Sequence, residues 1–517
     1  MPYLLKYHLI AVCMTFLLLL KNWRASAFRH FFPYSRHAYD AKILSSALCL
    51  KLEDRSGFKS SSPYGAKENS SRWRKLPLDK AVIPLAEYSK DDFETRDNLS
   101  KSTLDPRPMS SPGKASPVEL RHIRGEQVYF KRDDLLRLPG SGISGNKARK
   151  MLALNQIPAE EFPECVASYG GPQSNAMLAI AAIVHSKNLE LDLLMSKNET
   201  TMKSNSESLP LHAPRRFIYY VKKLPRFLKK NPSGNFFRAK MLGMELVELT
   251  NSVYHDYFRR DYGAEDNAPN GLEAPVPYDS AWIPQGGACS AALPGGTALA
   301  NEIILFWSEN GKGRPLTVLL PGGTCSSALI LHREIRRIQE ACKNGIKLDI
   351  KVVVIPCIGD EGYALRQMMG LNMATGGSGE RNEIPSILKP APDADFYLED
   401  NKKQQYIRFG EPNREVLRIY QEMEESGMNI DLLYGAPSWS ILLRHWPETE
   451  GCKFGSPLLD RRELLYVHSG GLEGINSQLM RYRHKGLIEG RKVQHPERQR
   501  RSSKELFRTG DLDFRGN

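Results

Sequence analysis

The chain has 517 residues, of which 41% are hydrophobic and 25% charged, and these shares exclude a disordered or fibrous protein. Eight cysteines without a Cys-x-x-Cys pair indicate neither a disulfide scaffold nor a zinc ribbon, so we expect no metal site. The net charge of +13 lies mainly in residues 1–80, with 14 Lys and Arg against 5 Asp and Glu, and in residues 486–517, with 8 against 5. The body therefore lacks the basic core groove of a nucleic-acid enzyme, and we expect no nucleic-acid partner.

The N-terminal segment has the pattern of a targeting signal. The apolar run from Leu9 to Leu20 is shorter than the ~20 residues needed to cross a bilayer, and Ala25-Ser26-Ala27 supplies a cleavage site. We therefore predict a signal peptide over 1–27 and a transit-peptide-like segment over 28–80, which is rich in Arg, Lys and Ser. With Phe28 after the cleavage site, the segment resembles bipartite plastid presequences and predicts a plastid location without membrane attachment of the mature form. An ordinary secretory signal or an uncleaved anchor is the alternative.

The body of the chain alternates strand and helix patterns from residue 128 onward. Continuous apolar runs are typical of buried parallel strands, and their alternation with helical stretches predicts an α/β fold. Residues 199–230, with 8 basic and 2 acidic side chains, and about 251–278 lack clear periodicity, so we interpret both as surface insertions. The expected strands are 128–130, 318–320, 350–355 and 464–467, and the expected helices are 146–155, 175–185, 298–308, 327–343, 414–425 and 475–485.

A basic motif provides the first candidate site. Lys131-Arg132-Asp133-Asp134 is followed by Gly145-Asn146-Lys147-Ala148-Arg149-Lys150, which places Lys147 at a loop-to-helix junction. A rigid helix end can hold this amine near a ligand, and a confined lysine can form a Schiff base with an aldehyde cofactor. The alternative is an ordinary solvated run of basic residues at a helix start.

Three glycine-containing loops provide further candidates. Tyr169 to Asn175 opens an Ala-rich helix and can bind a carboxylate, unless Ser174 only caps that helix. Leu319 to Ser327 runs from a buried strand into a Gly-Gly-Thr turn that can cradle a phosphate, although it lacks the lysine of a Walker loop. Leu465 to Gly471 is another strand followed by small residues, and its Ser469 can place a hydroxyl at a ring nitrogen. Plain turns are the alternative for the last two loops.

These motifs, in this order, resemble one family. Lys-Arg-Asp-Asp, Gly-Asn-Lys-x-Arg-Lys, Gly-Gly-x-Gln-Ser-Asn, Gly-Gly-Thr and a final His-Ser-Gly-Gly are similar to the D-cysteine desulfhydrase and 1-aminocyclopropane-1-carboxylate (ACC) deaminase family of pyridoxal-phosphate enzymes. This family has fold type II, and the resemblance covers about residues 115–485. Weaker matches lie at Gly234-Asn235, Leu242-Gly243, Ile283 to Gly287, Phe409 to Asn413 and Asp431 to Tyr434.

The resemblance implies an α/β protein of two domains, each with a mainly parallel twisted sheet flanked by helices. The large cofactor-binding domain would comprise residues 81–155 and 280–485, and the small domain residues 156–279 with the basic insertion 199–230. Residues 486–517 would form a basic C-terminal tail. The family further implies pyridoxal 5'-phosphate as cofactor, a small amino acid as substrate and a homodimer.

The resemblance also implies a role for each motif residue. Lys147 would hold the cofactor as a Schiff base and then act as the base on the substrate Cα. Ser174 would bind the substrate carboxylate, Asn175 would bind the ring hydroxyl, and Tyr434 would lie near the substrate. The other cofactor ligands would be Gly322, Gly323 and Thr324 at the phosphate and Ser469 at the pyridine nitrogen.

The implied reaction is an elimination. The cofactor delocalises the charge that forms at Cα, and the neutral Ser469 hydroxyl would not hold the ring nitrogen protonated, which favours expulsion of a β-substituent. We therefore expect conversion of D-cysteine into pyruvate, sulfide and ammonia. ACC deamination is the first alternative and ranks lower, because Phe409, Gly435 and Ser469 depart from the pattern of ACC deaminases. Ala176 replaces a frequent family histidine, so a non-catalytic pyridoxal-phosphate-binding protein is the second alternative.

Overall fold

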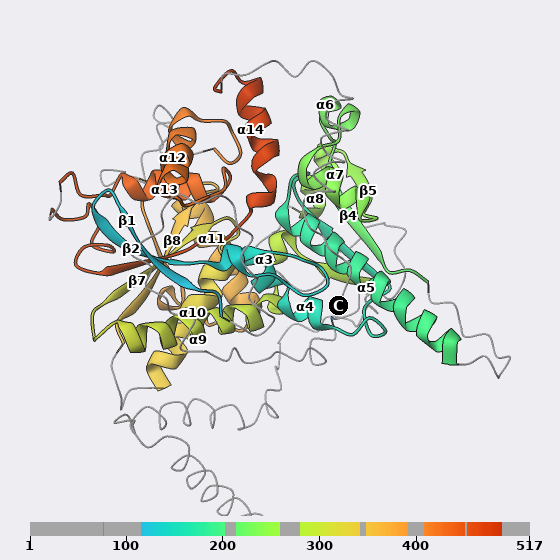
Figure 1. The fold of residues 1–517 in the computed structure, drawn as a ribbon, viewed down its shortest axis with the longest axis horizontal. Coiled ribbons are helices and arrows are strands. Elements are labelled where there is room, and N and C mark those ends of the chain that lie inside the picture. The colour runs from blue at the N-terminus through green and yellow to red at the C-terminus, as the bar shows by residue number, and fades with distance from the viewer. Residues whose placement is uncertain are drawn as a thin grey trace, which may run out of the picture. The chain divides into compact units, whose positions relative to one another are not determined.

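The computed structural model describes Leu76 and residues 115–201, 213–258, 280–341, 348–390, 408–449 and 452–488 (Figure 1). The predicted signal peptide, the transit-peptide-like segment apart from Leu76, and residues 489–517 of the predicted basic tail lie outside these ranges. Within them, no helix combines the length and the apolar character that crossing a membrane requires.

Six strands form the larger sheet in the order β1-β2-β10-β7-β8-β9. β1 and β2 are an antiparallel hairpin, whereas every other neighbouring pair is parallel. β10 comes late in the sequence and pairs with both β2 and β7, which places Val467 opposite Lys131. The loop after β10 therefore lies beside the segment that follows β2. The strands are β1 Val118–Ile123, β2 Glu126–Lys131, β7 Leu316–Gly322, β8 Ile350–Pro356, β9 Ser386–Ile387 and β10 Glu463–Val467.

Four parallel strands form the smaller sheet in the order β5-β4-β3-β6. β3 and β4 are central, and every residue of β3 is buried. Helices on both faces explain this burial, because a parallel sheet covered on both sides needs apolar residues throughout. The strands are β3 Cys165–Tyr169, β4 Arg216–Lys222, β5 Glu245–Leu249 and β6 Ser280–Ile283.

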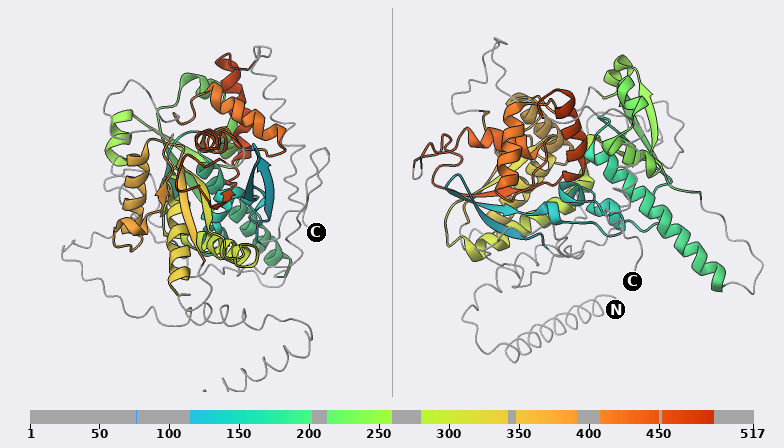
Figure 2. Two further views of the ribbon diagram at one scale, coloured as in Figure 1. Left: turned by 90° about the vertical axis from the view of Figure 1, so that its left-hand side faces the viewer. Right: turned by 45° about the horizontal axis from the view of Figure 1, so that its top comes forward.

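Helices also cover both faces of the larger sheet (Figures 1 and 2). In β7, Leu319 faces a core shared with α12 and α13, whereas Val318 and Leu320 face a core shared with α9, α10 and α11, because successive side chains of a strand point to opposite faces. On the smaller sheet, α5 and α7 cover one face and α8 the other. The helices are α3 Gly145–Lys150, α4 Leu152–Gln156, α5 Asn175–Thr201, α6 Arg226–Lys230, α7 Gly234–Met241, α8 Asn251–Phe258, α9 Leu293–Asn310, α10 Ser326–Ala341, α11 Glu361–Ala374, α12 Arg414–Glu425, α13 Gly435–Leu443 and α14 Ile475–His484, with the 3-10 turns η3 Asp133–Leu135, η4 Gln285–Gly287, η5 Ser290–Ala292, η6 Arg381–Glu383 and η7 Leu472–Gly474.

The strand pairing confirms the predicted α/β class with two mainly parallel sheets. The expected strands 318–320, 350–355 and 464–467 lie within β7, β8 and β10, and the expected helix 414–425 coincides with α12. The expected helix 146–155 is divided at Met151 into α3 and α4. This break sets the direction of the short helix that carries Lys147.

The prediction of a surface insertion over 199–230 is wrong for residues 216–222, which form the central strand β4. Phe217 to Val221 are all buried. Arginines precede this five-residue apolar run and lysines follow it, so the local charge concealed the strand. Asn251–Phe258 likewise forms α8, and β6 extends the smaller sheet beyond the expected domain boundary at residue 279.

Candidate functional site

The candidate site lies beyond the carboxyl ends of parallel strands, where α/β proteins usually bind ligands. The loops after β3, β6, β7 and β10 contact one another, and α3 packs against them. Every residue that the sequence singled out stands on these segments or directly before α13. They are Lys147 on α3, Ser174 and Asn175 after β3, Gly322, Gly323 and Thr324 at the end of β7, Tyr434 before α13 and Ser469 after β10.

The start of α3 holds Lys147 against the loop after β10. The Asn146 N–H donates to the Ser469 carbonyl at 2.8 Å, and the Asn146 Oδ1 accepts from the Ser327 hydroxyl at 2.6 Å. Gly145 has a φ of +64°, and a Cβ at this position would collide with the Ser469 carbonyl, so the close approach requires glycine. Lys147 is thus fixed between the loop after β10 and the first turn of α10.

Buried ion pairs anchor the end of α3. The Arg149 guanidinium binds both Glu302 oxygens, at 2.5 and 2.6 Å, and Asp133 at 2.8 Å. Lys131 adds a 2.6 Å ion pair with Glu302, and all four side chains are buried. Two cations and two carboxylates therefore balance inside the protein. This cluster gives three residues of the basic motif a structural role in positioning Lys147.

Lys147 itself has no carboxylate partner among the residues that the structure describes. Its side chain is half-buried, and burial lowers the pKa of the Lys147 amine to about 8, because the surroundings penalise the charged form. An ordinary lysine has a pKa of about 10.4. A substantial fraction of Lys147 is therefore neutral, and nucleophilic, near pH 8.

We expect Lys147 to react with aldehydes at lower pH than other lysines do. Apo-protein is treated with an aldehyde over a range of pH, reduced with borohydride and mapped by peptide mass spectrometry. Because deprotonation produces the reactive form, labelling of Lys147 should rise with a midpoint near pH 8. Lys351, exposed on β8, is the control within the same sample. A midpoint for Lys147 close to that of an ordinary lysine would contradict the expectation.

A second lysine lies at the Gly-Gly-Thr turn. The buried Lys150 amine lies 3.4 Å from the Thr324 hydroxyl and 3.3 Å from the Gly286 carbonyl. Burial, and then repulsion by Lys147, lower the pKa of Lys150 well below its usual range. An anion at this place would favour the charged amine, so the turn, the helix start and Lys150 together form a candidate phosphate cradle.

The loop after β3 is supported from beneath by β4. The Tyr219 hydroxyl donates to the Gly171 carbonyl at 3.3 Å and lies beside the Ser174 hydroxyl. Ser174 also accepts from the Met177 N–H at 3.3 Å, so it caps α5 as its alternative interpretation expected. Asn175 lies against Gly471, where a Cβ would stand 3.2 Å from the Asn175 Nδ2. The loops after β3 and β10 therefore meet at this amide.

Tyr434 lies over the Gly-Gly-Thr turn. A Cβ at Gly323 would stand 3.0 Å from the Tyr434 ring, and the half-exposed Phe409 ring lies 5.3 Å from that ring. The Tyr434 N–H donates to Asp431 at 2.7 Å, which fixes the turn into α13. Burial raises the pKa of Tyr434, and the neighbouring Asp431 raises it further, so the phenol stays protonated and can donate a hydrogen bond.

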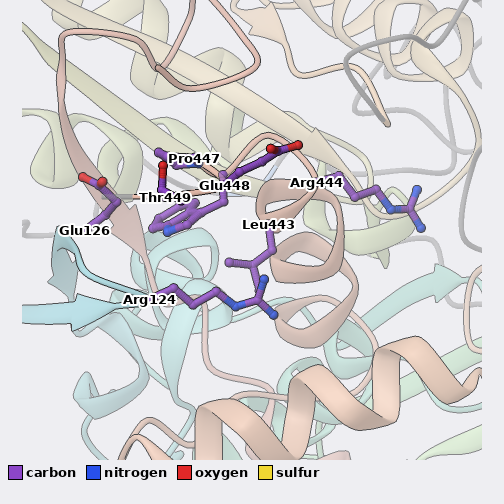
Figure 3. Close-up of a pocket in the computed structure, with 8 residues that line it drawn as sticks. Arg124, Glu126, Leu443, Arg444, Pro447, Glu448 and Thr449 are labelled. Carbon is purple, nitrogen blue, oxygen red and sulfur yellow. The ribbon is translucent and has the colours of Figure 1, made fainter. Parts of the chain in front are cut away.

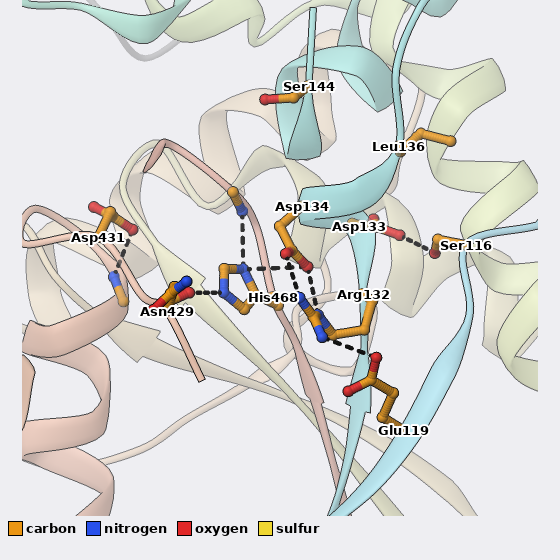
Figure 4. Close-up of polar contacts among 12 residues, drawn as sticks. Ser116, Glu119, Arg132, Asp133, Asp134, Leu136, Ser144, Asn429, Asp431 and His468 are labelled. Carbon is orange, nitrogen blue, oxygen red and sulfur yellow. Dashed lines mark hydrogen bonds and ion pairs between the residues drawn. The ribbon is translucent and has the colours of Figure 1, made fainter. Parts of the chain in front are cut away.

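A buried histidine links three segments behind Ser469 (Figure 4). The His468 Nε2 donates to the Asn429 carbonyl at 2.6 Å, and its Nδ1 accepts from the Gly470 N–H at 3.2 Å. Asp134 lies 3.7 Å from Nδ1. The main chain around Ser469 is thereby held on both sides, by His468 and by the start of α3.

A separate surface pocket contains none of the predicted site residues (Figure 3). Arg124 and Arg444 line it, yet each guanidinium already binds a carboxylate. Arg124 pairs with Glu422 at 2.7 Å, and Arg444 pairs with Glu415 at 2.8 Å. We assign no ligand to this pocket, because the protein itself satisfies its cations.

Comparison with known proteins gives matches among solved structures only, because no family model and no curated protein matches the chain. An ACC deaminase homologue is 17% identical, with a TM-score of 0.44, over 71% of this chain and 93% of that one. O-acetyl serine sulfhydrylase isoform 3 from Entamoeba histolytica is 11% identical, with a TM-score of 0.38, over 77% and 98%. A hydrogen sulfide-producing enzyme from Fusobacterium nucleatum is 10% identical, with a TM-score of 0.36, over 69% and 96%. Similarity at this level concerns the path of the chain and not its chemistry.

Five side chains join the site without having been assigned a role from the sequence. Lys150 stands three residues after Lys147, a spacing that places both on one face of a helix and could have revealed it. Asn235, Asp431 and His468 lie inside matched motifs, but their types alone do not show what they bind. Tyr219 lies in β4, which we interpreted from the sequence as part of a surface insertion, so nothing in the sequence pointed to a role for it.

Proposed function

We propose that the chain is a pyridoxal-phosphate-dependent lyase that removes a β-substituent and ammonia from a small amino acid. The observation that carries the proposal is the pair of amines, Lys147 and Lys150, beside the Gly-Gly-Thr turn. Neither amine has a carboxylate partner within the described ranges. Such a site favours an anion at Lys150 and offers a neutral amine at Lys147, which together suit an aldehyde that carries a phosphate.

The residues of the turn fit a phosphate. Gly322 has no room for a side chain, because a Cβ would lie 2.5 Å from Val354, and a Cβ at Gly323 would meet Tyr434 at 3.0 Å and Ile358 at 3.5 Å. The Thr324 and Ser326 hydroxyls lie 3.1 Å apart, and Ser326 begins the 16-residue helix α10. The first N–H groups of a helix have no partner within the helix and can bind an anion. Lys150 would supply the countercharge.

The remaining residues would orient the cofactor and move the proton. Pyridoxal phosphate, when bound, supplies an electron sink that makes the substrate Cα proton acidic. Lys147 would accept that proton, which its pKa of about 8 allows near neutral pH. Asn175 would donate to the ring oxygen, Ser174 would bind the substrate carboxylate, and the Ser469 hydroxyl would meet the ring nitrogen.

The surroundings of Tyr434 support a small neutral substituent. Its ring contacts the apolar Phe409 side chain and lies over Gly323, and the nearby Asp431 carboxyl is bound by the main-chain N–H groups of the turn into α13. The thiol of D-cysteine suits this environment. Cleavage of the Cα–H and Cβ–S bonds and addition of one water would give pyruvate, hydrogen sulfide and ammonia.

The test is sulfide release by the full-length protein with added pyridoxal phosphate. We expect a visible absorption band from the bound cofactor, together with sulfide and pyruvate in equal amounts from D-cysteine. L-Cysteine and ACC are assayed in parallel. Product from ACC alone would replace the proposed substrate, and a bound chromophore without product from any amino acid would leave a cofactor-binding protein that does not catalyse. Absence of the absorption band would overturn the proposed function.

A further inference from the structure

We infer that Asn235 is a positioning residue that determines which atom of the Asn175 amide faces the cofactor. The inference rests on the proposed function, because it concerns the cofactor ring. Asn235 lies in the first turn of α7 and is 1% exposed. It contacts the loop after β3 and would not touch the cofactor itself.

A chain of hydrogen bonds fixes the orientation of the two amides. The main-chain carbonyl of Gln173 can only accept, and the Asn235 Nδ2 donates to it at 3.2 Å. The same Nδ2 donates its other hydrogen to the Asn175 Oδ1 at 2.6 Å. The Asn175 Nδ2 must then point the other way, toward Gly471 in the loop that carries Ser469.

The backbone reinforces this arrangement. The Asn235 N–H donates to the Gln173 Oε1 at 2.9 Å, and the Gln173 Nε2 donates to the Ser233 carbonyl at 3.0 Å. Gly234 has a φ of +62°, and a Cβ there would collide with the Gln173 side chain. The loop after β3 and the start of α7 are therefore held together. Rotation of the Asn235 amide would break both of its hydrogen bonds, and rotation of the Asn175 amide would break the bond that joins the two.

The Asn235 side-chain oxygen indicates that this amide serves as a hydrogen-bond donor and not as an acceptor. Its Oδ1 is buried and has no hydrogen-bond partner among the described residues. A buried oxygen without a partner is unfavourable, and an apolar side chain would avoid that penalty. What asparagine provides at this position is the pair of N–H groups, both of which are used.

This arrangement determines which kind of ligand atom can bind to Asn175. Because Asn175 presents an N–H, the atom that it meets must be a hydrogen-bond acceptor. A ring oxygen in its ionised form meets this requirement better than a hydroxyl does. Asn235 thus favours the ionised ring oxygen through Asn175.

The test replaces Asn235 in two ways. Asn235→Asp puts acceptors where both donors stand and turns the Asn175 N–H away from the cofactor, whereas Asn235→Leu removes the donors without reversing them. Titration with pyridoxal phosphate should show affinity weakened about 10- to 100-fold in Asn235→Asp, and less in Asn235→Leu, as expected for loss of a hydrogen bond to a charged group. In Asn235→Asp, the absorption of the ionised ring should also decrease relative to that of the neutral form.

Asn188→Asp is the matched control. Asn188 is also an amide, on α5, and it bridges the Arg215 main chain at 2.7 and 3.0 Å. Within the described ranges these are its side-chain hydrogen bonds, and neither involves a site residue named above. Asn188→Asp should lower the thermal midpoint of the apo-protein and leave cofactor affinity unchanged. Equal affinities of wild type and Asn235→Asp would overturn the inference, as would equal losses in both Asn235 variants that merely follow their thermal midpoints. Failure of the wild type to bind the cofactor would instead reject the proposed function.

Discussion

Lys147→Ala should abolish the covalent linkage of pyridoxal phosphate and lower sulfide release from D-cysteine by at least about 10²- to 10⁴-fold, the contribution of a positioned acid–base group. The physical reason is that Lys147 would be both the amine that holds the aldehyde and the base at Cα, and its low pKa suits both tasks. Absorption spectra, borohydride reduction followed by mass spectrometry, and initial rates measure the effect.

Two further variants make this result specific. Lys351→Ala removes an exposed lysine of β8 and should behave as the wild type. Lys150→Ala should weaken cofactor affinity but retain the covalent linkage at saturating cofactor, because Lys150 is placed at the phosphate cradle. If a covalent adduct formed in Lys147→Ala but not in Lys150→Ala, Lys150 would be the residue that holds the aldehyde, and Lys147 would lie at the phosphate.

Glu302→Gln should destabilise the fold by about 3–5 kcal/mol, the usual consequence of leaving buried charges uncompensated. Although burial raises the pKa of Glu302, the charges of Arg149 and Lys131 hold it below the usual range, so the carboxylate is ionised. Its loss would leave Asp133 to balance two buried cations. Urea unfolding of the wild type and the variant, followed by circular dichroism, measures the difference.

The control breaks an exposed ion pair of similar geometry. Arg216 and Glu245 lie 2.6 Å apart, but their side chains are 37% and 44% exposed, and water screens them. Glu245→Gln should therefore change stability by only about 0–1 kcal/mol. If both variants lost equal stability, the buried cluster would not have the role assigned to it.

The sequence predicted the larger sheet better than the smaller one for a physical reason. β7, β8 and β10 are nearly continuous apolar runs, because helices cover the sheet on both sides. β4 is as deeply buried, yet its five apolar residues lie between arginines and lysines in the sequence, so the average charge of the segment concealed the strand. Apolar periodicity does not reveal a buried strand when the strand is short and charged residues flank it on both sides.

Some residues of the candidate site could also be predicted from the sequence, whereas others could not. Lys147, the Gly-Gly-Thr turn and Ser469 lie in motifs of small residues that come at strand ends, so they could be proposed from the sequence, and the structure brings them together. Lys131 and Arg149 belong to the same motif, but only burial shows that they neutralise Glu302. The partner of a buried charge lies far away in the sequence, and spacing alone does not identify it.

The central place of β10 also determines when the protein can fold. Lys131, at the end of β2, and Glu463, at the start of β10, are 332 positions apart in the sequence, yet β10 is the strand that joins the β1–β2 hairpin to β7. During synthesis the hairpin therefore waits for β10 while more than 300 intervening residues are made, and such non-local pairing is slow. The larger sheet, and with it the loop that carries Ser469, is therefore completed only when β10 has been synthesised.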